Sequence, residues 1–356
     1  MRRRAFLGAI GASAALPAQG WAAAGNPRYL AAARHGSDRH VLHGLRSDAS
    51  SAFSIDLPER GHAAAAHPYR AEAVAIARRP GTFAFVVDCL TGSLRVRLAA
   101  PEGRHFYGHG VYTADGSLLL LTENQFEDGD GRISLWDVEN GYERRGDIPS
   151  GGIGPHEILR RPDGGFAIAN GGIRTHPDTG REKLNLDTMA PNLTLMSADL
   201  ATTGQIRLPT WLKQNSIRHL AVRSDGLLAL AMQWNGLTDH TVPPIALVTQ
   251  DASPILCTIP ESLVQRIEGY VGSVAFSGDG RLVAATAPRG DCLMLFDAET
   301  GSLSNVLAAT DICGVARHGD GLLATQGTGD IIMLGNEHDL PKAHPVAWDN
   351  HLVALY

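Results

Sequence analysis

A short unit recurs along this sequence and limits the folds that the chain can form. The unit consists of an apolar strand, a tight turn that usually reads Asp-Gly, and a second apolar strand. Copies lie at residues 109–124, 156–170, 219–233, 273–286 and 314–326, with a looser copy at 73–88 around Arg79-Pro80-Gly81. Because glycine adopts a positive φ at little cost, Asp-Gly between two apolar runs predicts a β-hairpin.

A second pattern follows the hairpins. Residues 133–141 and 293–301 both read as an apolar strand that ends in an aromatic residue and Asp, followed by a turn to Gly, and residues 193–200 are a weaker copy. This pattern is typical of propeller blades. The Asp-Gly turns at Asp115, Asp163, Asp225, Asp279 and Asp320 are 48, 62, 54 and 41 residues apart. That spacing suits one four-stranded blade with loops of variable length.

These repeats predict an all-β chain that folds as a single β-propeller of seven four-stranded blades, of the WD40, quinoprotein or YVTN type. Six hairpin copies account for six blades, residues 29–57 supply a seventh, and a terminal segment is expected to complete the ring. Closure removes the sheet edges that would otherwise favour aggregation. A pair of β-sandwiches is the alternative, and it would not explain the regular spacing of the turns.

The N-terminal residues predict export. Arg2, Arg3 and Arg4 precede Phe6-Leu7, a short apolar run and an Ala-x-Ala cleavage site at residues 22–24. We therefore interpret residues 1–24 as a twin-arginine signal peptide, residues 25–356 as the propeller domain and the periplasm as its compartment; an ordinary secretory signal is the alternative. The apolar run is too short to span a bilayer, and no later stretch reaches about 18 apolar residues.

Charge and cysteine usage exclude several classes of function. The net charge is −6 without a basic run, so nucleic acid and anionic membranes are not expected partners, and we expect a monomer. The four cysteines (Cys89, Cys257, Cys292 and Cys313) form no C-x-x-C motif, which excludes the usual zinc-ribbon, thioredoxin-like and c-type haem signatures. Cys292 and Cys313 could form a disulfide in an oxidising compartment, although buried thiols are the favoured interpretation.

Histidines open the first strand of three hairpin units. His109, His156 and His219 each precede an Asp-Gly turn by six or seven residues, so we expect them at equivalent positions around the axis. Since the first strand of a blade is innermost, they should converge on the mouth of the central channel. His62 and His67 are weaker candidates to join them. Polar residues end the second strands at the same rim: Asn124, Asn170 and Gln233.

The loops on this rim are the longest in the chain, and one is a candidate lid. Residues 171–192 are too long and too specific in composition for a passive linker. The candidate ligand-binding residues of this insertion are Arg174, His176, Arg181, Lys183 and Asn185. A solvated insertion whose charges pair internally is the alternative interpretation.

The histidines suit metal chemistry best. Neutral imidazoles converging on one axis bind Cu, Zn or Fe, and Glu157 could add a carboxylate. A small anion clamped by Arg218, Arg174 and Arg70 is an alternative. A metal-independent, lactonase-like hydrolase in which His156 and Glu157 activate a water is another. A protein-docking platform with structural histidines is the third. No sequence motif names a reaction, so whether the protein is an enzyme stays open.

Four stretches of the sequence resemble a family of uncharacterised exported bacterial propellers, which is known as a domain of unknown function. The stretches are residues 77–83, 154–157, 170–185 and 216–220, and the likeness extends over the whole mature chain. Genes of this family commonly lie beside imelysin-type iron-uptake proteins and a di-haem, thiol-oxidoreductase-like protein. The resemblance therefore implies a binding or redox accessory in periplasmic iron or metal handling, and it implies no catalytic residues.

Overall fold

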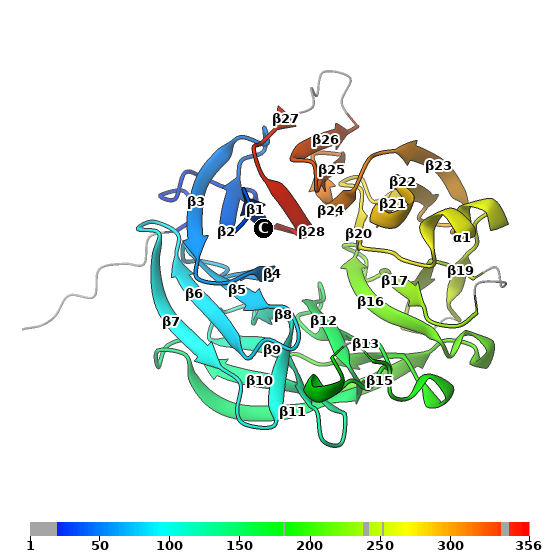
Figure 1. Ribbon diagram of the computed structural model, residues 1–356, viewed down its shortest axis with the longest axis horizontal. Coiled ribbons are helices and arrows are strands. Elements are labelled where there is room, and N and C mark those ends of the chain that lie inside the picture. The colour runs from blue at the N-terminus through cyan, green and yellow to red at the C-terminus, as the bar shows by residue number, and fades with distance from the viewer. Residues whose placement is uncertain (1–19, 181, 238–241, 251–252, 336–341, 356) are drawn as a thin grey trace, which may run out of the picture.

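Seven antiparallel sheets surround a central axis in the computed structural model of the chain (Figure 1). The structure describes residues 20–180, 182–237, 242–250, 253–335 and 342–355. Each sheet has four strands, which confirms the predicted seven-bladed β-propeller. Within the described residues, no helix is both long enough and apolar enough to cross a membrane.

Each blade runs from an innermost strand beside the axis to an outermost strand at the rim. In that order, the strands of the seven blades are β28 (Ala347–Ala354), β1 (Tyr29–His35), β2 (Arg39–Leu45) and β3 (Ser51–Leu57); β4 (Gly61–Ala66), β5 (Glu72–Ala77), β6 (Phe83–Asp88) and β7 (Ser93–Ala99); β8 (Arg104–Tyr112), β9 (Leu118–Gln125), β10 (Asp130–Asp137) and β11 (Glu143–Ile153); β12 (Pro155–Arg160), β13 (Phe166–Asn170), β14 (Asn192–Met196) and β15 (Thr202–Arg207); β16 (Asn215–Val222), β17 (Leu228–Trp234), β18 (Ile245–Val248) and β19 (Ile255–Cys257); β20 (Ser273–Phe276), β21 (Leu282–Ala287), β22 (Cys292–Asp297) and β23 (Leu303–Ala308); and β24 (Ile312–His318), β25 (Gly321–Gln326), β26 (Asp330–Leu334) and β27 (Lys342–Ala343). The described helices are α1 (Glu261–Ile267) and the 3₁₀ turns η1 (Pro177–Thr179), η2 (Leu186–Thr188), η3 (Thr210–Leu212) and η4 (Pro288–Gly290).

The core lies between neighbouring blades. The second and third strands of a blade are buried on both faces, as β13 and β14 are, whereas the outermost strands such as β15 alternate between exposed and half-buried positions. Ile76 of one blade and Leu121 of the next, for example, belong to the same buried cluster. This face-to-face packing explains why the inner strands read as continuous apolar runs.

The C-terminal strand closes the ring. β28 pairs with β1, with Ala354 opposite Tyr29 and Trp348 opposite Ala33. It is therefore the innermost strand of the blade that the N-terminal strands build, and Figure 1 shows it beside the axis. This closure satisfies two sheet edges at once and fixes the two ends of the fold against each other.

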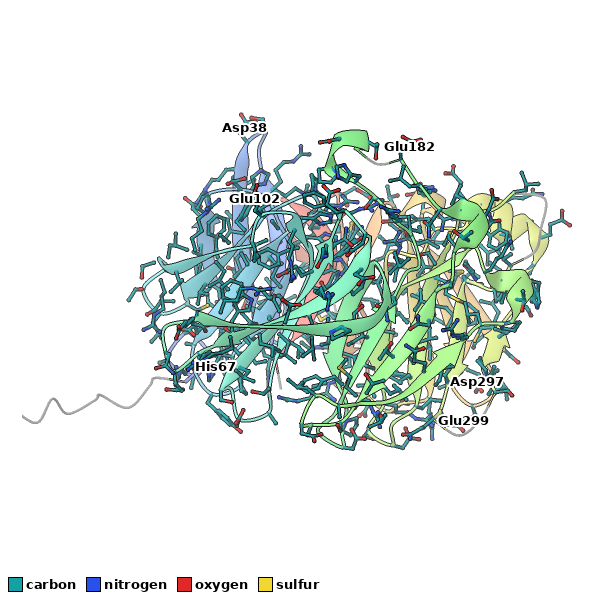
Figure 2. The ribbon with its side chains drawn as sticks, turned by 90° about the horizontal axis from the view of Figure 1, so that it is seen from below. Asp38, His67, Glu102, Glu182, Asp297 and Glu299 are labelled. Carbon is teal, nitrogen blue, oxygen red and sulfur yellow. The ribbon has the colours of Figure 1, made fainter. Side chains whose placement is uncertain are left out.

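The two faces of the ring differ. Glu182, from the long insertion, lies at one face, and Asp297, Glu299 and His67 lie near the other (Figure 2). Arg223 joins the Asp225-Gly226 turn to Glu299, so the Asp-Gly turns share the second face. We refer to the two faces below as the lid face and the turn face.

The looser repeat at residues 73–88 contains the second and third strands of its blade, whereas the other copies contain the first and second strands. Its two strands are β5 and β6, the second and third of their blade, and β4 is the innermost strand. The connection that contains Arg79-Pro80-Gly81 therefore lies on the lid face rather than among the Asp-Gly turns. β4 was missed because Ala63 to Ala66 are small and lack the long apolar residues of the other first strands.

All four cysteines are buried and free. Cys292 and Cys313 form no disulfide, in agreement with the favoured interpretation of buried thiols. Burial raises the pKa of the Cys313 thiol to about 12. These thiols therefore have little nucleophilic thiolate at neutral pH.

The N-terminal end of the described chain packs against the fold. Trp21 lies against the apolar cluster of the first blades, and its indole Nε1 donates to the backbone oxygen of His67 at 2.8 Å. Trp21 belongs to the segment that we interpret as a signal peptide.

His43 on β2 gives the fold a pH dependence. It is 7% exposed and lies against Trp348, and burial together with the charge of His344 lowers its pKa from 6.5 to about 4. A lowered histidine pKa gives stability that is complete above pH 6.5 and lost as the pH falls toward 4, up to roughly 3 kcal/mol. The free energy of unfolding of a His43→Gln variant should therefore fall less steeply over this interval. Urea titrations of both proteins at pH 7, 5.5 and 4.5 check this, and parallel curves would contradict it.

Candidate metal centre

Five histidines from five neighbouring blades meet on the axis. They are His62 on β4, His109 on β8, His156 on β12, His219 on β16 and His351 on β28. Adjacent imidazole rings have centroids between 4.4 and 5.5 Å apart, with His62 and His156 separated by 6.2 Å. We call these five residues the histidine cluster. His156 is partly exposed, and the other four are at least nine-tenths buried.

β-Bulges aim these side chains at the axis. In every blade except that of β20, the described register between the innermost strand and its neighbour shifts near the lid face. The shifts fall between Gly61 and Ala63, Phe106 and Gly110, Pro155 and Glu157, Ile217 and His219, Ile312 and Val315, and, on β1, Ala31 and Ala33. The extra residue is His62 in β4 and His156 in β12. A bulge turns a side chain out of the regular alternation, which is why bulges often lie at functional sites.

Gly108 makes room for His62. Its φ is +99°, a backbone conformation that residues other than glycine rarely adopt. A Cβ at this position would lie 2.5 Å from Cδ2 of His62. The glycine before His109 is therefore required both by the backbone and by the neighbouring imidazole.

Two carboxylates contact the cluster from outside. Glu157 Oε2 lies 3.1 Å from Nδ1 of His219, and its Oε1 lies 3.9 Å from Nδ1 of His109. Asp349 Oδ1 lies 3.6 Å from Nδ1 of His62, and Arg60 binds the other oxygen of that carboxylate at 2.8 Å. A carboxylate that accepts a hydrogen bond from one imidazole nitrogen directs the other nitrogen inward and fixes the tautomer, as carboxylates do behind metal-bound histidines.

Burial favours the neutral form of four imidazoles of the cluster, those of His62, His109, His156 and His351. Burial lowers the pKa of His62 and lowers those of His109, His156 and His351 well below 6.5, and neighbouring imidazoles and arginines lower the last three further. His156 is partly exposed at its surface but lies deep on the axis, so burial is still the largest cause. A neutral imidazole offers the lone pair that a metal ion requires.

The imidazole nitrogens are spaced as the ligands of a single metal ion would be. Nε2 of His351 and Nε2 of His62 are 3.1 Å apart, and nitrogens bound to one ion at about 2.1 Å are separated by about 3.0–3.4 Å. Nε2 of His109 and Nδ1 of His156 are buried and have no hydrogen-bond partner among the described residues. Unpartnered buried nitrogens are costly, and a metal ion would satisfy them.

The ligand atoms form two overlapping groups of three. One group is His62, His109 and His156, the other is His109, His219 and His351, and within each group the ligand atoms lie within 4.8 Å of one another. The fit to a metal of the Fe, Cu or Zn class is therefore good, because imidazole suits these ions. His109 is the member that both groups share.

The structure brings together the three histidines expected at the mouth, with one difference in register. His219 pairs with Ala231 as Glu157 pairs with Ala169, so these two residues are equivalent. His156 lies one residue earlier than the position expected from its distance to the turn. Both hairpins have a bulge at the same place, and His156 occupies in its blade the bulge position that Arg218 occupies in the next. His62 joins the cluster, as the weaker prediction proposed.

Several predicted site residues lie away from the cluster. His67 is on the turn side, where its Nδ1 accepts from the backbone of Tyr69 and Arg70, and Arg70 pairs with Glu139. The prediction that His67 or Arg70 reaches the rim is wrong, because both lie in the turn between β4 and β5, on the turn face.

Two asparagines of the rim have structural roles. Asn124 contacts His105 at 3.2 Å, whereas Asn170 binds the backbone of Ser150 and the side chain of Asn192. The bond of Asn124 joins two strands of one blade, and those of Asn170 join its blade to the preceding one as well as to β14. Gln233 does line the mouth, and its Nε2 donates to the oxygen of Val271.

The insertion at 171–192 folds over the lid face, but most of its predicted ligand residues hold the loop itself. Asn185 bonds to the backbone of Arg174 and of Gly172, and Arg174 bonds to the backbone of Glu127. His176 caps η1. Arg181 lies outside the described residues. Lys183 is exposed and is not among the residues that line the mouth.

Sequence reasoning missed His351 and Asp349. Both lie on β28, and no Asp-Gly turn follows that strand because the chain ends there. Reading residues 347–354 as a first strand that pairs with residues 29–35 would have found them. Arg78 and Arg79, which line the mouth, were missed because the repeat at 73–88 was assigned to the first and second strands of its blade instead of the second and third. Tyr107, which also lines the mouth, lies on β8 just before His109.

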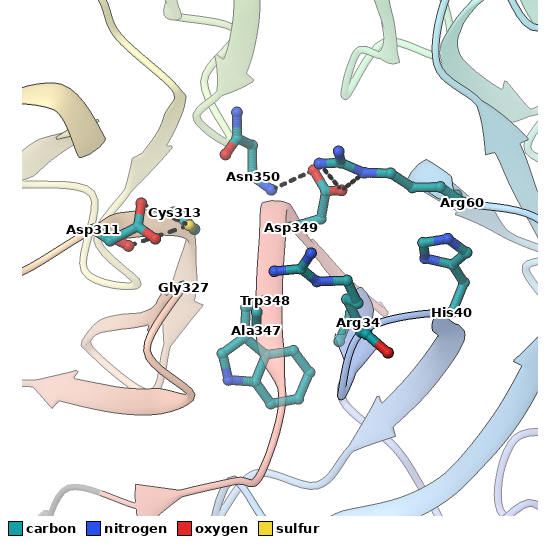
Figure 3. A pocket seen from close by; sticks show the side chains of 13 residues that line it. Arg34, His40, Arg60, Asp311, Cys313, Gly327, Ala347, Trp348, Asp349 and Asn350 are labelled. Atoms are coloured by element: carbon teal, nitrogen blue, oxygen red, sulfur yellow. Dashed lines mark hydrogen bonds and ion pairs between the residues drawn. The ribbon is translucent and has the colours of Figure 1, made fainter.

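Two pockets adjoin the cluster. The smaller one, of about 70 Å³, opens on the axis and is lined by His62, Arg78, Arg79, Tyr107, His156, Arg218, His219, Gln233, Tyr270 and Asn350. The larger one, of about 380 Å³, lies between the last and first blades, where Asp349 binds Arg60 (Figure 3). Since Asp349 faces both this pocket and His62, it connects the larger pocket to the cluster.

Comparisons with known proteins agree with this architecture. Residues 55–355 match the family model described as "Protein of unknown function (DUF1513)". A comparison with curated proteins finds no match.

Solved structures show the same fold at low identity. The chain is similar to one from "Kuenenia stuttgartiensis Hydrazine Synthase", with a TM-score of 0.62, 12% identity and coverage of 84% of this chain and 90% of that chain. It is also similar to "Streptogramin B lyase structure", with a TM-score of 0.55, 12% identity and coverage of 80% and 82%. A chain of the "Crystal Structure of Mitotic Checkpoint Complex" has a TM-score of 0.55, 14% identity and coverage of 80% and 76%. These likenesses show the fold alone.

Proposed function

The chain belongs to the DUF1513 family of proteins of unknown function, and we propose that it binds a transition-metal ion of the iron, copper or zinc class in the histidine cluster. The observation that carries the proposal is the convergence of five imidazoles on one point of the axis, with ligand atoms within 4.8 Å in two overlapping groups. A single buried histidine is usually structural. Five converging imidazoles, among which His109 and His156 each have a buried nitrogen without a hydrogen-bond partner among the described residues, are energetically unfavourable without an ion.

The ion would be held by His109 together with members of either group. Glu157 and Asp349 would orient the imidazoles and balance the charge of a divalent ion. The bound metal would supply a Lewis acid or a redox centre. The chain's own residues would keep the imidazoles neutral, restrict water to the pocket at the mouth and hold the ion in a rigid ring of strands.

We propose further that the protein works in the periplasm after twin-arginine export, as an accessory to iron or other metal uptake or to a redox reaction. The sequence of residues 1–24 and the genomic association implied by the family resemblance support this role. Periplasmic iron-uptake proteins and di-haem redox proteins are the corresponding candidate partners.

Metal analysis of the exported protein tests the proposal. Protein purified from the periplasm without a histidine tag should hold about one equivalent of a transition metal, measured by elemental mass spectrometry, and the metal-free protein should bind Zn²⁺, Cu²⁺ or Fe²⁺ with the same stoichiometry. Substoichiometric metal that is the same in wild type and in a His156→Ala variant would overturn the proposal.

The carboxylates behind the cluster provide a second test. Glu157→Gln and Asp349→Asn each keep the size of the side chain but weaken the acceptor behind His219 or His62. We expect each to reduce metal affinity by about 10–100-fold, the range found for such partners. Glu102→Gln, on the exposed rim, is the matched control. Competition with a chromophoric chelator measures the affinities, and equal values in all three variants would contradict the assigned roles.

A hydrolase at the same mouth is the second candidate, and one observation favours it. Glu157 binds Nδ1 of His219 at 3.1 Å, an arrangement that could orient His219 as a general base for water. The sequence suggested His156 in this role, but the carboxylate contacts His219 instead. A hydrolase of this kind would turn over lactones or esters in the presence of chelators and lose that activity in His219→Ala.

A further inference from the structure

The pocket above the histidine cluster is basic, although the chain as a whole carries a net charge of −6. Of its ten lining residues, three are arginines, three are histidines of the cluster and none is acidic. The remaining four are two tyrosines, a glutamine and an asparagine, all of which offer hydrogen-bond donors. Such a lining is typical of a site for an anion.

Arg218 is the central cation of this pocket. It is 7% exposed, and its Nε has no hydrogen-bond partner among the described residues. No acidic residue among those described forms an ion pair with it. An unpaired buried guanidinium is strongly unfavourable. The absence of an internal partner among the described residues therefore indicates that a bound anion pairs with Arg218.

Other cations lie close to Arg218. Arg79 shares the pocket and donates to Thr175 of the insertion at 3.2 Å. Burial and then the charge of Arg79 lower the pKa of Arg218 to about 10. These groups repel one another, and an anion between them would remove the repulsion.

Tyr107 adds a neutral donor. Its hydroxyl is buried and has no hydrogen-bond partner among the described residues. The pocket of about 70 Å³ is far smaller than the roughly 300 Å³ of a site for a drug-sized ligand. It therefore has room for a small oxyanion or for one anionic head group.

We infer that this pocket binds a small oxyanion, of the carboxylate or phosphate class, between Arg218 and Arg79. The anion lies directly above His156 and His219, which also line the pocket, and one of its oxygens completes the coordination of the metal ion. This second part rests on the proposed function. The first part does not, because the guanidinium and the hydroxyl require an acceptor whether or not a metal is bound.

Calorimetry on the metal-free protein tests the anion site alone. We expect oxalate or inorganic phosphate to bind, and the neutral oxamide not to bind. Arg218→Gln should weaken binding at least 10-fold, and Arg218→Lys should restore part of the loss. Arg39→Gln, which removes an exposed arginine paired with Asp56, is the matched control and should bind as wild type does. The anion that binds more tightly, oxalate or phosphate, identifies the class of the ligand as carboxylate or phosphate.

Absence of anion binding in the wild type, or equal binding in wild type and Arg218→Gln, overturns the inference. The metal content of the same samples is measured separately. Tighter oxalate binding in the metal-loaded protein, lost in His156→Ala while metal-free binding persists, supports the shared coordination. Equal binding with and without metal overturns that part and leaves the anion site standing.

Discussion

A variant in which His109→Ala and His219→Ala are combined is expected to bind metal at least ~1,000-fold more weakly than the wild type. His109 belongs to both candidate ligand groups, so its loss disrupts each of them. Structural zinc sites with four ligands bind with about 10–16 kcal/mol, so the loss of two ligands corresponds to several kcal/mol. Competition titrations with a chromophoric chelator measure the change.

The matched control removes two histidines outside the cluster, His35 and His176. It should bind metal as the wild type does, because neither residue lies on the axis. Circular dichroism must show that both double variants fold, since the first creates a cavity in the channel. Equal metal affinity in the two folded double variants would contradict the assignment of the ligands.

Gly108→Ala is expected to damage both the fold and the cluster. The new Cβ would lie 2.5 Å from Cδ2 of His62, at a backbone φ of +99°. Backbone strain costs about 1–3 kcal/mol, and the clash adds about 1–3 kcal/mol. We therefore expect a loss of about 2–6 kcal/mol in the free energy of unfolding, together with about 10-fold weaker metal binding as His62 moves.

Gly226→Ala separates the two causes. Gly226 has a φ of +93° and no atom within 4 Å of the position of a Cβ, so it carries the strain without the clash. The Gly226→Ala variant should lose only the strain contribution to the free energy of unfolding, roughly 1–3 kcal/mol, and should keep the metal affinity of the wild type. Urea unfolding and metal titration of both variants give the comparison. Equal losses in the two variants would show that the contact between Gly108 and His62 does not matter.

The ring of blades could be predicted from the sequence because every blade repeats the same local signals. Asp-Gly turns and paired apolar strands are local properties, and the fold follows from their repetition. The C-terminal strand was only expected in general terms, because it pairs with β1 at the opposite end of the chain, as in the pair of Ala354 and Tyr29. No local pattern indicates such a pairing.

The site was predictable to the same degree. His109, His156 and His219 each open a repeat, so their convergence follows from symmetry. His351 lies on the strand without a repeat, and Asp349 reaches His62 only through closure of the ring. The insertion shows the other difficulty, since Arg174 and Asn185 have the chemistry of ligand-binding residues but hold the loop through backbone bonds. Chemical type alone could not distinguish these roles.

Anomalous diffraction from crystals soaked in Zn²⁺ and in Cu²⁺ is the decisive measurement for the metal site. Data collected on both sides of the metal's absorption edge locate the ion independently of any fitted side chain. We expect one strong peak on the axis, about 2.1 Å from a nitrogen of His109 and from nitrogens of at least two other members of the histidine cluster. A cluster without a peak, in crystals that show metal elsewhere on the surface, would contradict the proposed function.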